Sequence, residues 1–138
     1  MPRTPMNDRR ESRTVRITHV WAPGSMQEQH EDFPITFSCM PNGENIGEVF
    51  YDHDATGIQS NERIAQFRRE ACVLISLALQ WGVPLETLRD AMGHARHNFL
   101  GNDRIIPHTI FGAILDALAR EQGLPEPVLP IDPIDTES

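Results

Sequence analysis

Small polar and apolar residues alternate along residues 34–40. This period of two is typical of a β-strand with one buried face. Residues 41–45 contain an Asn-Gly pair, a strong signal for a tight turn, and residues 46–52 are again rich in apolar and aromatic side chains. The pattern predicts a β-hairpin over 34–52, and a looser alternation at 16–22 predicts a third strand.

The following part of the chain has a helical period. Ser60 is a favourable N-cap for a helix that reaches about Trp81, and apolar side chains recur within it at three- and four-residue spacing. From Ala71 onward this helix is apolar on nearly every side. That pattern is typical of a buried central helix.

Two shorter helices are predicted at 84–92 and 107–122, with a loop at 94–104 between them. The expected fold class is α+β, with a small antiparallel sheet of about three strands packed against three helices, one of them central and buried. The expected organisation is a flexible Arg-rich arm at 1–14, one domain at 15–123 and a disordered Pro-rich acidic tail at 124–138.

Composition excludes several kinds of chemistry. The 138 residues carry a net charge of −8, all 12 basic residues are Arg, and there are two Cys. Without Lys there is no Schiff-base or P-loop lysine, and two Cys are too few for a Cys₄ zinc site. No apolar run approaches the roughly 20 residues that span a bilayer, and the Arg-rich start lacks the apolar stretch of a secretory signal. We therefore expect a cytoplasmic protein.

Histidine and cysteine give only weak site candidates. His94 and His97 are the closest histidine pair, and on a helix they would share a face that could bind a metal. No third ligand stands at a diagnostic spacing, so we expect loop histidines in solvent, with no metal and no cofactor. Cys39 and Cys72 fall at predicted buried positions, where a thiol behaves as a small apolar group. No catalytic residue is assigned.

Arginines near the start of the long helix are candidates for binding a phosphorylated ligand. Arg63, Arg68 and Arg69 lie within three helical turns of the predicted N-terminus, and a helix N-terminus favours anions. Glu62 and Glu70 would neutralise part of this charge. A solvated charged face is the alternative interpretation.

Three apolar residues are candidates for binding a partner protein. Trp21 ends a predicted strand, and Phe99 and Leu100 lie in a predicted polar loop, where burial is not assured. The partner would be another protein or a second copy of this chain. The alternative is that these side chains simply cover the core.

Residues 77–91 also fit the spacing of a helix-turn-helix, with a small residue at the crossing and a glycine in the turn. Its second helix offers Glu86 and Asp90 against Arg89, and two acids there would repel phosphates. Nucleic-acid binding that also uses the Arg-rich arm is kept as an alternative function, although an acidic chain makes nucleic acid an unfavourable partner.

The middle of the chain resembles the TSCPD domain, which occurs at the C-terminus of vitamin B12-dependent (class II) ribonucleotide reductases and in short standalone bacterial proteins. The resemblance covers about residues 15–122. The matching residues are Gly47, Glu48, Val49 and Phe50, then Leu74, Ile75, Ser76, Leu77, Ala78, Leu79, Gly82, Val83, Pro84 and Leu88. Residues 105–109 depart from the family, because they lack the Thr-Ser-Cys-Pro-Asp string found in many members.

The resemblance implies an accessory role in nucleotide metabolism, with a ribonucleotide reductase as one candidate partner. The chain is too short to carry the catalytic barrel of such a reductase. We therefore expect a non-catalytic accessory or interaction module. A nucleic-acid-binding regulator and a binder of small phosphorylated ligands are the alternatives.

Overall fold

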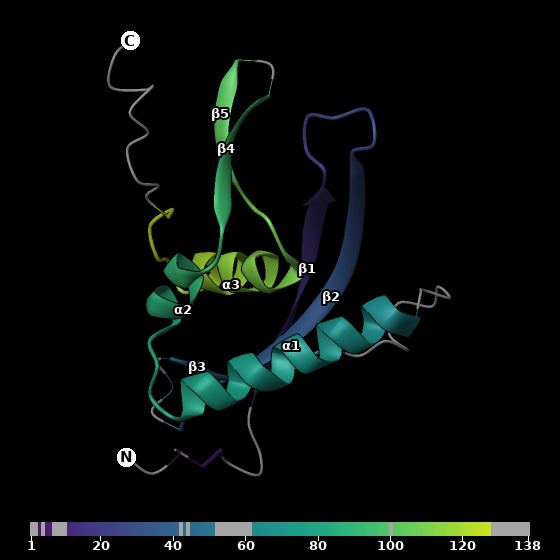
Figure 1. Ribbon diagram of the computed structural model, residues 1–138. Helices are drawn as coiled ribbons and strands as arrows, with labels where there is room; N and C mark the ends of the chain where they lie inside the picture. Colours follow the sequence, from purple (N-terminus) through teal and green to yellow (C-terminus); the bar gives the residue numbers. More distant parts are fainter. Residues whose placement is uncertain are drawn as a thin grey trace.

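The structure of the chain, a computed structural model, describes residues 3, 5–6, 11–41, 43, 45–51, 62–99 and 101–127. The elements in chain order are β1 (Ser12–Trp21), β2 (Gln29–Cys39), β3 (Ile46–Phe50), α1 (Glu62–Gln80), α2 (Leu85–Ala91), β4 (His94–Phe99), β5 (Asn102–Pro107) and α3 (Ile110–Glu121). Helices and antiparallel sheets together make an α+β fold, which confirms the predicted class (Figure 1).

The larger sheet has the strand order β1-β2-β3 and is antiparallel throughout. Along β2, Phe33, Ile35 and Phe37 are buried, as the period of two predicts. β2 and β3 form the predicted hairpin, with a register shift between Ser38 and Cys39. The predicted third strand is β1, which pairs with β2 over its whole length.

α1 lies along β3 and hydrogen-bonds to its backbone. Ser76 Oγ accepts a hydrogen bond from the Val49 N–H (2.8 Å) and donates one to the Val49 carbonyl (2.9 Å). One turn later, Gln80 Nε2 donates to the Gly47 carbonyl (2.8 Å). Four helical residues rise about 6 Å, close to the rise of two strand residues, so the two spacings match. Helix side chains therefore pair with edge-strand groups that would otherwise be open to another strand.

α3 closes the core from the side of β1 and α2. Its residues Ile114, Leu115 and Leu118 are almost fully buried and belong to one apolar core with residues of the large sheet and α1. The helix begins after Thr109, whose hydroxyl accepts a hydrogen bond from the Gly112 N–H (3.2 Å). This N-cap satisfies one of the free donors at the helix start.

The prediction of a loop at 94–104 is wrong, because β4 and β5 form a hairpin there. The strands pair from His94 opposite Pro107 to Phe99 opposite Asn102. Gly101, in the turn, has φ +87°, a conformation that favours glycine. Most residues of this segment are charged or polar, so the hydrophobic pattern gives little indication of its two strands. In Figure 1 the hairpin projects from the corner between α2 and α3.

The prediction that the long helix is buried on all sides is also corrected. The side of α1 that faces β3 is buried, including Ala71, Cys72, Ile75 and Leu79. The opposite side carries several large apolar side chains that are exposed. A three-stranded sheet and one further helix can cover only one side of a 19-residue helix.

The described structure extends past the predicted domain, 15–123, at both ends. Residues 12–14 belong to β1 rather than to an arm. Past α3, Leu124 packs against the core, and the Pro125 carbonyl accepts a hydrogen bond from Arg89 Nη1. The predicted N-cap Ser60, most of residues 1–11 and residues 128–138 lie outside the described residues.

Candidate functional site

Exposed apolar side chains gather on one side of α1 and just beyond its end. Their exposed fractions are 65% for Phe67, 55% for Val73, 56% for Leu74, 37% for Leu77 and 54% for Trp81. We call these five residues the α1 apolar face. Single exposed apolar residues are ordinary on protein surfaces, whereas several large ones on one side of a helix indicate an interaction site.

The orientation of this face is set by the opposite side of α1. Ser76 and Gln80 hold the helix to β3 by three hydrogen bonds, and Ile75 and Leu79 are buried beside them. Turning the α1 apolar face inward would break these bonds and expose the buried residues. The face is therefore a fixed feature of the fold.

The three arginines predicted to bind phosphate do not come together. Arg68 is on the buried side of α1, with its guanidinium 4.2 Å from the centre of the Phe33 ring and 3.0 Å from a Glu31 carboxylate oxygen. It also donates a hydrogen bond to the Tyr51 hydroxyl (3.2 Å). Arg63 and Arg69 are exposed. The geometry of Arg68 is that of a buried structural ion pair.

The candidates for partner binding have different surroundings. Trp21 is half-buried, and its ring lies edge-on to His19 at 4.2 Å between centroids. His19 is fully buried, and burial lowers the pKa of its imidazole, with the Glu31 carboxylate opposing that effect. Leu100 and the side chain of Phe99 lie outside the described residues.

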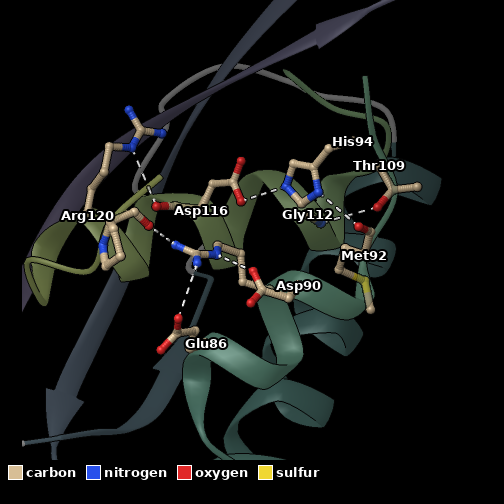
Figure 2. Close-up of polar contacts among 10 residues, drawn as sticks. Glu86, Asp90, Met92, His94, Thr109, Gly112, Asp116 and Arg120 are labelled. Atoms are coloured by element: carbon tan, nitrogen blue, oxygen red, sulfur yellow. Dashed lines mark hydrogen bonds and ion pairs between the residues drawn. The ribbon is translucent and has the colours of Figure 1, made fainter. Parts of the chain in front are cut away.

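The two predicted loop histidines are strand residues with different roles. Because side chains alternate along a strand, His94 and His97 point to opposite faces of β4. The His94 side chain is buried, with Nδ1 2.9 Å from the Met92 carbonyl and Nε2 2.9 Å from Asp116 Oδ1 (Figure 2). Among the described residues, no group of three His, Cys, Asp or Glu side chains could bind a metal.

The geometry of the His94–Asp116 pair implies a bound proton. A carbonyl oxygen can only accept, so Nδ1 of His94 carries a hydrogen and donates to Met92. The contact between Nε2 and Asp116 then needs a second hydrogen, on one of the two side chains. Burial raises the pKa of Asp116, and the His94 hydrogen bond offsets part of that rise. The pair joins the start of β4 to α3.

Arg89 is held in a similar way at the second helix of the predicted helix-turn-helix. It is buried, and its guanidinium lies 3.0 Å from Asp90 and 4.0 Å from Glu86 (Figure 2). A third contact is the hydrogen bond to the Pro125 carbonyl. These contacts engage the guanidinium within the chain, so it is not presented to a phosphate backbone.

A cavity of about 740 Å³ lies between β1, β5 and α3. Its charged lining is balanced, with four arginines and four acids: Arg16, Arg89, Arg104, Arg120, Asp103, Asp116, Glu121 and Glu126. This balance gives the cavity no net attraction for an anionic or a cationic ligand.

Neither cysteine is placed as a nucleophile. Cys72 is buried in α1, where burial raises the pKa of its thiol to about 12. Cys39 is half-buried at the register shift of β2. Both are free thiols. Cys72 belongs to the core, as predicted, whereas Cys39 is less buried than predicted.

The sequence interpretation missed the α1 apolar face, although its signal was present. A helix that is apolar on nearly every side needs cover on every side, and the predicted elements were too few to supply it. Within the described part of the chain, no helix is both long and apolar enough to cross a bilayer. Comparisons of the chain with known protein families, curated proteins and solved structures find no match.

Proposed function

We propose that this chain is a non-catalytic interaction module that binds another polypeptide chain through the α1 apolar face. The observation that carries the proposal is the group of five large apolar side chains exposed on one fixed side of a helix. An amphipathic helix whose second apolar side is uncovered gains free energy when a partner removes that side from water.

The placement of the reactive groups supports a non-catalytic role. Arg68 is paired with Glu31, and His94 with Asp116, in buried contacts that join separate elements. The Cys72 thiol is buried. Each of these groups contributes to the fold, whereas a catalytic group is directed at a substrate.

The resemblance to the TSCPD domain makes a ribonucleotide reductase a candidate partner and nucleotide metabolism the corresponding process. A cytoplasmic setting is part of this proposal, and two free thiols are in keeping with a reducing compartment.

The test is affinity capture from a lysate with three forms of the full chain. Leu74→Glu places a charge in the centre of the α1 apolar face. Met26→Glu is the matched control, because Met26 is a fully exposed apolar residue in the loop between β1 and β2. Proteins retained by the wild type and by Met26→Glu but lost with Leu74→Glu support the proposal. Equal retention by all three forms contradicts it.

A further inference from the structure

We infer that the partner of the α1 apolar face is a second copy of this chain, with the two α1 helices antiparallel across a two-fold axis at Leu74. This inference rests on the proposed function, because it names the occupant of the same surface. The resulting dimer is closed, since each copy uses the same patch and no apolar face is left over for further growth.

The spacing of the exposed residues suits such a pairing. Phe67, Leu74 and Trp81 follow each other at seven-residue intervals, the repeat that keeps side chains on one side of paired helices. Leu74 is therefore midway between the two aromatic residues. With the helices antiparallel about Leu74, this residue meets its own copy, and Phe67 of each chain meets Trp81 of the other. This pairing covers both ends of the α1 apolar face.

The charges along α1 favour the antiparallel arrangement. Residues 62–81 contain three Arg and two Glu, a local charge of +1 in a chain whose net charge is −8. Two copies can therefore approach along this segment without the repulsion expected from their total charge. A parallel pairing would put Glu70 against its own copy, whereas the antiparallel pairing puts it beside Ala78. Like charges at an interface are unfavourable, so the antiparallel order is preferred.

The size of the face is sufficient for a specific dimer. Given the exposed fractions above, the five side chains present roughly 500 Å² of apolar surface, from the ordinary sizes of aromatic and aliphatic side chains. Complete coverage of these residues in both copies would bury about 1,000 Å², which is the lower bound for a biological interface. Neighbouring polar residues of α1 add a rim to this area. The two aromatic residues have the character of interface hot spots.

The first test is the mass of the full chain in solution, measured by analytical ultracentrifugation from low to high micromolar concentration. We expect a monomer–dimer equilibrium for the wild type and for Met26→Glu. Leu74→Glu places two carboxylates at the two-fold axis and should weaken the dimer by at least about 100-fold. Added salt should not dissociate the dimer, because the contact is apolar and the copies have like net charge. A monomer at every concentration, or a dimer insensitive to Leu74→Glu, would overturn the inference.

The second test reports the register. It uses mild oxidation of variants that carry one added cysteine in a Cys39→Ser background, where the remaining native thiol, Cys72, is buried. Leu74→Cys should form a disulfide-linked dimer, because residue 74 faces its copy. Phe67→Cys and Trp81→Cys should cross-link efficiently only when mixed with each other, and Met26→Cys is the negative control. Equal cross-linking of Phe67→Cys with itself and with Trp81→Cys would contradict the antiparallel register.

These tests separate the inference from the proposed function. If the chain is monomeric while Leu74→Glu still abolishes capture of another protein, self-pairing is wrong and the interaction module stands. If the chain dimerises through α1 and captures no other protein, the inference holds and binding of a different protein through this face is wrong.

Discussion

The contact between Ser76 and β3 offers a sharp test of how α1 is held. Ser76→Ala removes the hydroxyl that accepts from the Val49 N–H and donates to the Val49 carbonyl. Ser76 is 8% exposed, so water has little access to the two backbone groups that lose their partner. An unpaired buried donor or acceptor costs about 1–3 kcal/mol, and alanine returns a few tenths of a kcal/mol in helix propensity. We expect the free energy of unfolding to fall by about 3 kcal/mol.

The chain contains a matched control for this substitution. Ser25 also donates to a carbonyl, that of Ala22 (2.8 Å), and accepts from a backbone N–H, that of Gln27 (3.1 Å), but it lies in an exposed turn. In Ser25→Ala water can replace both hydrogen bonds, so we expect a loss of less than about 1 kcal/mol.

Two measurements decide the outcome. Urea denaturation gives the free energy of unfolding of each variant, and amide hydrogen exchange reports on Val49 directly. Exchange at Val49 should accelerate strongly in Ser76→Ala and stay unchanged in Ser25→Ala. Similar losses of stability in both variants, or an unchanged exchange rate at Val49, would refute the idea that Ser76 closes the edge of β3.

Three further predictions concern titratable groups. Burial raises the pKa of the Cys72 thiol to about 12, so this thiol should react slowly with an alkylating reagent at mildly alkaline pH. Peptide mass spectrometry should show that half-buried Cys39 is modified first in the folded protein and that both thiols are modified in urea. Burial lowers the pKa of His19, so the stability that comes from its neutral imidazole is present above about pH 6.5 and is lost as the pH falls. The free energy of unfolding of His19→Gln should therefore decrease less than that of the wild type when the pH falls below about 6.5. Burial raises the pKa of Asp116, so the folded chain binds that proton more tightly than the unfolded chain does, and stability is lost as the pH rises above about 4. The free energy of unfolding of Asp116→Asn should therefore increase relative to that of the wild type as the pH rises above about 4, and a pH-independent difference would contradict this.

The larger sheet and the helices could be predicted because their signals are local. The alternation along β2 and the Asn-Gly turn gave the β2–β3 hairpin, and the helical period gave α1 and α3. The β4–β5 hairpin could not be found in this way, because its strands are mostly polar and its pairing depends on backbone groups that every residue has.

The candidate site depended on information beyond a local window. Arg63, Arg68 and Arg69 are close in sequence, so they were predicted to bind one phosphate near the start of the helix. In the structure, β2 lies beside α1 and Arg68 pairs with Glu31 of that strand. A loop was predicted around His94 and His97, whereas both lie in a strand that directs their side chains to opposite faces.

For this chain, the amino-acid sequence by itself determined which segments form the larger sheet and the helices, and it excluded lysine-based chemistry. Only the tertiary structure decided which side of α1 is covered. The physical reason is that backbone preference and hydrophobic period act over a few residues, whereas burial depends on how much surface the neighbouring elements can cover. The small sheet and α3 leave Phe67, Leu74 and Trp81 exposed, and the proposed function depends on this exposed surface.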